Sequence, residues 1–174
     1  MKRFVVISTL LIACACAPAF GAKSVPNRWW FGGGLGLAFG DVTFISVEPV
    51  IGYSISPKLS AGARLIFRFR EDERYGQDIS TNDYGAGLFV RYLVARPFFV
   101  QGEYEHLNYE IPYSDGSSER QGYDSVFGGF GVAQPIGTNT AFFASILYNF
   151  LWSDDEPSPY AEQWVFRAGV TVAF

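Results

Sequence analysis

The chain has 174 residues, a length that fits one domain. Aromatic residues make up 18% of it and charged residues only 17%, so it is richer in aromatic rings and poorer in charge than a typical soluble domain. Its formal net charge of -4 and the lack of a basic patch in the sequence exclude nucleic acid as a partner.

The first 21 residues have the pattern of a cleaved signal peptide. Lys2 and Arg3 form a positive start, and residues 4–13 form an apolar stretch that is too short to span a bilayer. Ala19-Phe20-Gly21 then supplies the small residues that signal peptidase needs, which predicts cleavage before Ala22. We therefore expect an exported protein whose mature domain covers residues 22–174.

Two alternatives for the leader stay open. Ala17-Pro18-Ala19 offers a second cleavage site. Leu11-Ile12-Ala13-Cys14 resembles a lipobox, in which Cys14 would be lipidated and become the first residue. Both cysteines, Cys14 and Cys16, lie in this leader, so cleavage before Ala22 leaves a mature chain without a disulfide framework.

The first four predicted strands cover residues 29–39, 44–55, 58–70 and 83–94. In the third, only Ile66 interrupts the alternation of an apolar face (Leu59, Ala61, Ala63, Leu65, Phe67 and Phe69) with a polar one. A period of two indicates a strand with one apolar and one polar face. In the second, Pro49 cannot donate a ladder hydrogen bond, which predicts a bulge or a local kink.

The last four predicted strands cover residues 97–109, 123–133, 140–152 and 163–174. The sixth strand overall is rich in glycine, and its faces are not assigned by alternation. The final strand alternates in the same way as the third, with one apolar face made of Trp164, Phe166, Ala168, Val170, Val172 and Phe174. These lengths suit tilted membrane strands of about 9–11 residues with extended ends.

The connections alternate between short and long. Short turns are predicted at Ser56-Pro57, at Ala95-Arg96 and at residues 134–139, and longer polar loops at residues 71–82, 110–121 and 153–162. Only the brief connection at residues 40–42 breaks this order. Short turns on one side and long loops on the other are typical of outer-membrane barrels, and an even strand number places both termini on the short-turn side.

Alternation alone also fits a soluble barrel with apolar side chains inside. However, the apolar faces carry large aromatic residues near the strand ends: Trp29, Tyr53, Phe69, Tyr84, Tyr92, Tyr104, Trp152 and Trp164. This distribution is typical of the aromatic girdles at the two lipid–water boundaries. The sequence therefore predicts an all-β fold, an eight-stranded antiparallel up-and-down transmembrane β-barrel with its apolar faces outward.

The polar faces carry charges that we expect to pair inside the barrel. Glu48 and Arg64 lie at similar distances from the first short turn, and Arg91 and Glu103 flank the second. The predicted interior network consists of Glu48, Arg64, Arg68, Arg91, Glu103, Glu105 and Arg167. Because an isolated buried ion costs several kcal/mol, we interpret this set as a plug of the lumen; the alternative is that some charges reach water at the barrel mouths.

The leader, the eight alternating segments and the closing stretch of residues 164–174 resemble the small outer-membrane β-barrel proteins of the outer-membrane protein A and X type and the opacity-protein type. The resemblance covers the whole mature chain. It implies a place in the bacterial outer membrane among lipid and lipopolysaccharide. It also implies recognition by the barrel-assembly machinery, with Trp164, Phe166 and Phe174 as the C-terminal assembly signal. Family members include adhesins, envelope-stabilising proteins and lipid-modifying enzymes, so the resemblance leaves the function open.

His106, the only histidine, is the one candidate for catalysis. The lipid A deacylase barrels use a lipid-facing histidine with a nearby serine and an acidic residue, but here Asn108 stands where that serine is expected, and no catalytic residue is predicted. The acidic stretches at residues 71–73 and 154–156 lack EF-hand spacing and are interpreted as solvated loop charge. We therefore predict no metal and no cofactor.

These observations favour a non-enzymatic, monomeric envelope protein with a structural role. The first alternative is a surface-binding barrel that acts through exposed loop groups such as Tyr75, Tyr113 and Tyr160. The second is a lipid A-modifying enzyme. A solute porin is disfavoured because side chains fill the narrow lumen of an eight-stranded barrel.

Overall fold

The computed structural model describes residues 28–38, 42–72, 79–112, 118–153, 158–160 and 162–173. The expected signal peptide of residues 1–21 and the lipobox at Cys14 lie outside these residues. The described strands are β1 (Trp29–Ala38), β2 (Val42–Ser54), β3 (Leu59–Asp72), β4 (Ile79–Ala95), β5 (Phe98–Pro112), β6 (Ser118–Pro135), β7 (Thr140–Asn149) and β8 (Trp164–Ala173).

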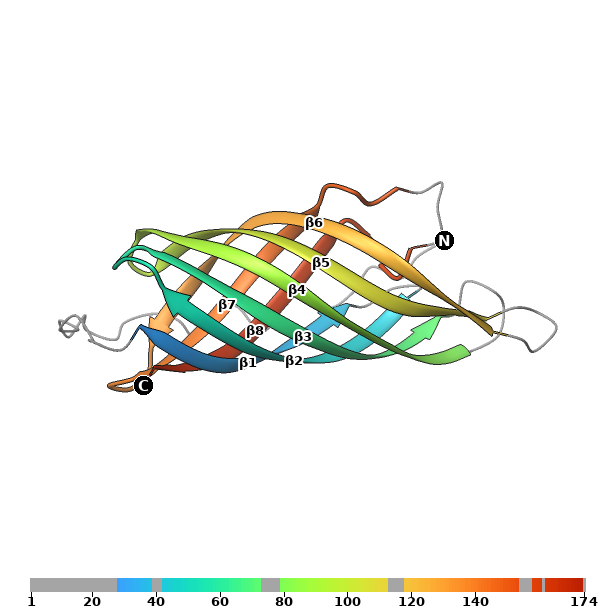
Figure 1. Cartoon of the computed structure of the whole chain (residues 1–174), viewed down its shortest axis with the longest axis horizontal. Helices are drawn as coiled ribbons and strands as arrows, with labels where there is room; N and C mark the ends of the chain where they lie inside the picture. The colour runs from blue at the N-terminus through green and yellow to red at the C-terminus, as the bar shows by residue number, and fades with distance from the viewer. Residues whose placement is uncertain are drawn as a thin grey trace, which may run out of the picture.

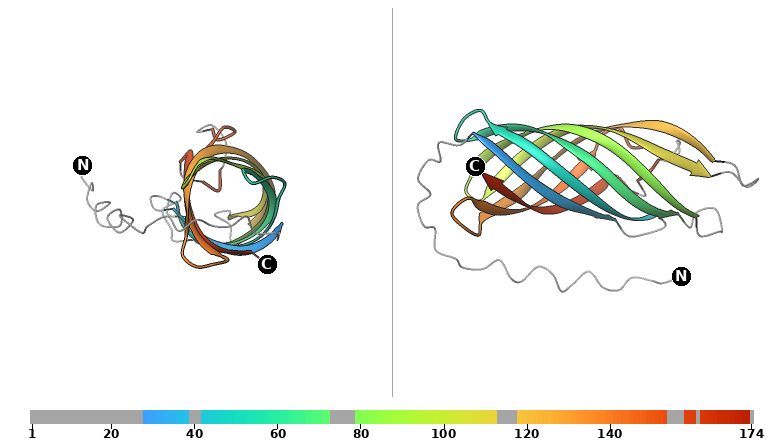
Figure 2. Two further views of the ribbon diagram at one scale, coloured as in Figure 1. Left: turned by 90° about the vertical axis from the view of Figure 1, so that its left-hand side faces the viewer. Right: turned by 60° about the horizontal axis from the view of Figure 1, so that its bottom comes forward.

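The strands form one closed antiparallel barrel (Figure 1). Each strand pairs with its neighbours in the chain, and β8 closes the ring by pairing with β1, so that Trp30 lies opposite Ala173. Viewed from one end, the strands make a complete ring (Figure 2). The predicted fold class is confirmed, and the start of β1 and the end of β8 lie at the same end of the barrel as the short turns.

Several strands are longer than the alternation predicted. β3 and β4 stay paired as far as Asp72 and Ile79, and β5 and β6 as far as Pro112 and Ser118. Much of the two predicted loops at residues 71–82 and 110–121 is therefore strand. The alternation stops earlier because hairpin ends beyond the apolar band need no apolar face, although their backbones still pair.

Of the bulge or local kink predicted at Pro49, the bulge is wrong. The register between β2 and β3 is the same on both sides of it, with Val47 opposite Phe67 and Val50 opposite Arg64. Only the ladder partners of Glu48 and Pro49 on β3 are missing. A proline removes one donor without adding a residue, so the ladder has a gap but keeps its register.

The register does shift once elsewhere, between β4 and β5. The shift lies between Leu93 and Ala95, beside the turn at Arg96-Pro97, whose peptide bond is cis.

The apolar faces point outward. In β3, Leu65, Phe67 and Phe69 are 53%, 57% and 47% exposed, whereas Arg64 and Arg68 between them are each 3% exposed. A barrel with apolar side chains outside and polar side chains inside has the arrangement of one that crosses lipid. None of the described residues forms a helix long and apolar enough to cross a membrane.

The predicted aromatic girdle needs one correction. Seven of the eight named aromatic residues point outward or lie at the surface, but Trp152 is partly buried against an interior cluster. β7 ends at Asn149, three residues earlier than predicted, and the chain turns at Phe150 and Leu151. Because this turn redirects the chain, the alternation no longer decides which way Trp152 points.

The interior has two apolar clusters toward the long-loop end. One contains Phe44, Phe127, Leu147, Tyr160 and Val165, and the other Ile66, Leu107 and Tyr109. Tyr123 packs against both of them. The buried charged side chains lie in the same interior: Glu48, Arg64, Arg68, Arg70, Asp83, Glu103, Glu105 and Arg167.

Candidate functional site

The lumen holds a compact group of ion pairs that joins four strands. Arg64 on β3 reaches Glu48 on β2 and Glu103 on β5, with both nitrogen–oxygen distances at 3.0 Å. Arg167 on β8 forms an ion pair with the same Glu103 and another with Glu105, the latter at 2.7 Å. Its Nε also lies 3.5 Å from Glu48.

Arg68 extends this group toward the long-loop end. Its Nη2 lies 3.9 Å from Glu105 and donates a 2.8 Å hydrogen bond to the hydroxyl of Tyr160. Its guanidinium is held between two rings, 4.0 Å from the centroid of Phe44 and 4.5 Å from that of Tyr160. We call the six charged residues joined in this way the lumen cluster: Glu48, Arg64, Arg68, Glu103, Glu105 and Arg167.

The lumen cluster is electrically balanced and almost dry. It contains three guanidiniums and three carboxylates, and none of these residues is more than 5% exposed. Breaking one partner in such a group leaves an uncompensated buried charge, which costs about 3–5 kcal/mol. The stability of the lumen cluster therefore depends on each of its six members. Its ion pairs cross the lumen from β3 to β8.

Arg91, the seventh predicted member, is not in the cluster. The expected contact with Glu103 is replaced by two hydrogen bonds from Nε and Nη2 to the side-chain oxygen of Gln101, at 3.0 and 2.9 Å. Gln101 in turn donates a 2.8 Å hydrogen bond to Glu103. The register explains the difference, since it places Gln101, not Glu103, directly opposite Arg91.

The position of Tyr160 differs from the one predicted. It was interpreted as an exposed loop group, but it is 2% exposed and lies in the barrel mouth. Its hydroxyl donates a hydrogen bond to Glu105, and its backbone oxygen accepts one of 3.1 Å from Trp152. Burial raises the pKa of this hydroxyl well above its ordinary value, so Tyr160 remains a donor at neutral pH. Tyr75 and Tyr113 lie outside the described residues.

The sequence interpretation missed three other interior contacts. Arg70 and Asp83 pair across β3 and β4 at 3.0 Å, and Ser46 donates a 2.6 Å hydrogen bond to Glu48. Asn149 binds Ser125 at 3.1 Å. The signal for the first pair was available, because both residues lie on the polar faces of neighbouring predicted strands.

His106 lies on the outer face, as the alternation predicted. Its Nδ1 is 2.7 Å from Oδ1 of Asp124 on β6, and the hydroxyl of Tyr104 donates a 2.7 Å hydrogen bond to the same oxygen. Within the described part of the chain, no serine, threonine or cysteine is hydrogen-bonded to His106. The same residues contain no group of three or more side chains able to hold a metal ion.

Two residues of the predicted assembly signal are described. Trp164 and Phe166 lie on the outer face of β8 and are exposed, and Trp164 packs edge-on against Tyr148 of β7 with ring centroids 5.0 Å apart. Phe174 lies outside the described residues.

Comparison with known proteins gives the fold alone. No protein-family model and no curated protein matches the chain. The N-terminal β-barrel domain of OprF from Pseudomonas aeruginosa superimposes with a TM-score of 0.54 and 16% identity, covering 85% of this chain and 98% of that domain. The chain has the fold of a small outer-membrane β-barrel.

Two further barrels are more distant. A de novo designed transmembrane β-barrel has a TM-score of 0.47 and 13% identity, over 87% of this chain and 99% of the design. The translocator domain of the autotransporter NalP from Neisseria meningitidis has a TM-score of 0.39 and 11% identity, over 85% of this chain and 87% of that domain.

Proposed function

We propose that the protein is a non-enzymatic barrel of the bacterial outer membrane that supports the envelope and does not conduct solutes. One observation carries this proposal: the lumen cluster joins β2, β3, β5 and β8 through direct ion pairs. A steady aqueous path requires several of these pairs to open at once. Each opening exposes a buried charge, so an open state costs several kcal/mol.

The aromatic groups on either side of the cluster support the same conclusion. Toward the long-loop end, Tyr160 and Phe127 pack with ring centroids 5.7 Å apart. Toward the short-turn end, Trp30 and Phe89 lie 5.9 Å apart. An eight-stranded barrel has room for side chains inside but little more, so these layers leave no wide channel.

Single-channel recording in planar lipid bilayers tests the closed lumen. We expect no steady conductance from the wild-type protein. Arg64→Ala should produce brief openings, because it removes the guanidinium that joins Glu48 to Glu103. Arg96→Ala, in the exposed turn between β4 and β5, is the matched control and should remain closed. Steady conductance by the wild-type protein would overturn the plug.

The envelope role needs a test in cells. In a strain that lacks the gene, we expect higher outer-membrane permeability to a dye or antibiotic. A barrel whose connections at residues 73–78, 113–117 and 154–157 are shortened should restore the barrier as well as the full protein does. If only the full protein restores it, the loops carry the function, and the surface-binding alternative replaces this proposal.

The partners that we propose are lipid, lipopolysaccharide and, during assembly, the barrel-assembly machinery. The outward aromatic residues of β8, Trp164 and Phe166, together with Phe174, are the proposed assembly signal. The exposure of Trp164 and Phe166 on the strand that closes the ring with β1 supports this assignment. We further propose that the barrel acts as a monomer.

A second candidate function has one observation in its favour. The hydrogen bond between His106 and Asp124 on the outer face is the acid–histidine half of a hydrolytic site, at a surface where an acyl chain could approach. Among the described residues no serine is hydrogen-bonded to this histidine, and Asn108 stands two residues further along β5, where the serine is expected. We therefore rank lipid modification below the structural role.

A further inference from the structure

Arg91 is a cation without a carboxylate partner. The other arginines of the described lumen, Arg64, Arg68, Arg70 and Arg167, each form an ion pair. Among described residues Arg91 forms none, and its hydrogen bonds go to Gln101, which is neutral. Gln101 donates a hydrogen bond to Glu103, but that carboxylate already forms ion pairs with Arg64 and Arg167. Among the described groups, one positive charge is therefore left over at the short-turn end of the lumen.

Aromatic rings hold the guanidinium of Arg91 in place. Its central carbon lies 4.2 Å from the ring centroid of Phe99 and 5.0 Å from that of Phe143, with Phe89 and Trp30 at 5.6 and 6.0 Å. Cations are stabilised over ring faces at such distances. Nε and Nη2 of Arg91 donate hydrogen bonds to Gln101, whereas Nη1 of Arg91 has no hydrogen-bond partner within the described part of the chain. The remaining donors of Arg91 are thus fixed in direction and unused.

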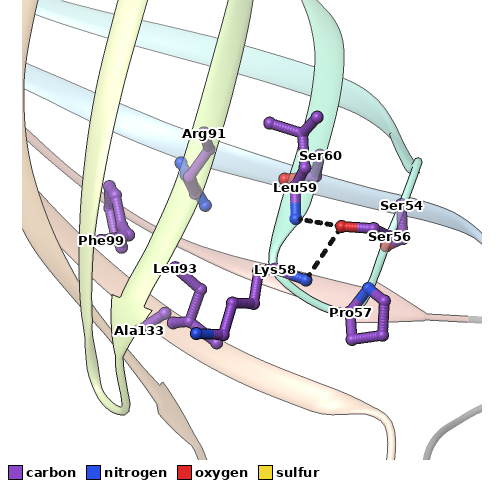
Figure 3. A pocket seen from close by; sticks show the side chains of 10 residues that line it. All are labelled: Ser54, Ser56, Pro57, Lys58, Leu59, Ser60, Arg91, Leu93, Phe99 and Ala133. Atoms are coloured by element: carbon purple, nitrogen blue, oxygen red, sulfur yellow. Dashed lines mark hydrogen bonds between the residues drawn. The ribbon is translucent and has the colours of Figure 1, made fainter.

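Arg91 is one of the residues that line a cavity of about 160 Å³ in the short-turn mouth (Figure 3). At about 30 Å³ for each water molecule, it has room for roughly five waters, or for a small oxyanion with some of them. Arg91, Lys58, Ser54, Ser56 and Ser60 supply the polar part of its lining, and the remaining lining residues are apolar. None of the lining residues in the described part of the chain carries a carboxylate.

Three serines line the cavity beside Arg91 and Lys58. Ser54, Ser60 and Arg91 are direct cross-strand neighbours on β2, β3 and β4, so they form one row across the mouth. The hydroxyl oxygen of Ser56 accepts the backbone N–H groups of Leu59 and Lys58, at 3.0 and 3.3 Å, which leaves its own hydrogen available for donation. A fixed guanidinium, an ammonium and hydroxyl donors form a set that matches phosphate oxygens.

We propose that the short-turn mouth of the barrel binds a phosphate-type oxyanion between Arg91 and Lys58. In the orientation that the short turns indicate, this mouth faces the periplasm. The anion is either free phosphate or the phosphate of a lipid headgroup in the adjacent leaflet. It neutralises the one described lumen arginine that lacks an ion pair, without contact with the lumen cluster.

Titration calorimetry of the whole folded protein in an uncharged detergent tests the proposal. One arm uses inorganic phosphate, and the other a short-chain phosphatidylglycerol, with the matching diacylglycerol as the phosphate-free control. Heat in both arms identifies a general phosphate site, and heat only with phosphatidylglycerol identifies a headgroup site. The absence of heat in both arms overturns the proposal.

Variants assign the binding to these residues. Arg91→Gln should weaken phosphate binding about tenfold or more, since hydrogen bonds to charged groups contribute about 1.5–3 kcal/mol, and Lys58→Gln should weaken it several-fold. Arg96→Gln, which removes an equal charge from a neighbouring turn outside the cavity lining, should bind as the wild type does. Equal weakening by all three variants would indicate nonspecific attraction and overturn the site. If Arg91→Gln does not fold, Lys58→Gln on its exposed turn decides the question alone.

Discussion

Tyr160 donates a hydrogen bond to Glu105, although one lies in the connection between β7 and β8 and the other on β5. The two residues are 55 positions apart in the chain. The same hydroxyl accepts a hydrogen bond from Arg68 on β3. A connecting segment therefore completes the polar interior of the barrel, and its tyrosine joins the lumen cluster to the apolar cluster above it.

Tyr160→Phe should lower the free energy of unfolding by about 1–3 kcal/mol. The ring and its contacts with Phe44 remain, but Arg68 loses an acceptor and Glu105 a donor, and buried polar groups without partners cost this much. Urea unfolding in phospholipid vesicles measures the change. Tyr92→Phe, on the outer face of β4, is the control and should be neutral. An equal loss in both variants would mean that the Tyr160 hydroxyl contributes nothing specific.

Glu103→Gln should destabilise the barrel more, by about 3–5 kcal/mol. This carboxylate pairs with both Arg64 and Arg167, and its neutralisation leaves two buried guanidiniums short of one negative charge. We expect a lower urea midpoint and a lower temperature for the shift in electrophoretic mobility between folded and unfolded forms. Glu162→Gln, an exposed substitution of the same chemistry, should leave both unchanged.

A double variant makes this test stricter. If Glu103 and Arg64 interact directly, Arg64→Gln combined with Glu103→Gln should destabilise less than the sum of the single changes. Strict additivity would show that the two side chains contribute independently and would contradict the lumen cluster as a unit.

The fold could be predicted because lipid imposes a simple rule on each strand. Every second side chain must be apolar, so residues such as Leu65 and Phe67 reveal both the strand and its outer face. The pairing of Glu48 with Arg64 also followed from the sequence, because residues at similar distances from a tight turn lie near one another on antiparallel strands. The direct partner of Arg64 is Val50, and Glu48 reaches Arg64 diagonally.

The same reasoning failed where the chain departs from regular pairing. The register shift beside Arg96-Pro97 contributes to placing Gln101 opposite Arg91, and Glu103 lies two residues further along β5. Tyr160 was placed wrongly, as an exposed loop group, because alternation says nothing about a connecting segment. Its hydroxyl accepts a hydrogen bond from Arg68 and donates one to Glu105. The sequence does not show that these two side chains lie close enough to share one hydroxyl.

Gly52 is the glycine whose replacement should affect packing most directly. The indole ring of Trp30 lies against it, and a Cβ at Gly52 would come within 2.6 Å of the Trp30 ring carbon Cη2. Gly52→Ala should therefore displace Trp30 from its place beside Phe89 and cost about 1–3 kcal/mol through overpacking. Tryptophan fluorescence during urea unfolding reports both effects. Gly102→Ala is the matched control, since nothing lies within 4 Å of its Cβ position.

The last prediction concerns the outer-face pair of His106 and Asp124. A histidine oriented by a carboxylate can accept a proton from a nucleophile, but hydrolysis of an ester needs a hydroxyl or an activated water within reach. Asn108 offers neither, so purified protein incubated with lipid A should release no fatty acid detectable by mass spectrometry. His106→Ala should behave in the same way. Release by the wild type that disappears in His106→Ala would establish a hydrolytic site and reverse the ranking of functions; release that persists in both proteins would identify a contaminating enzyme.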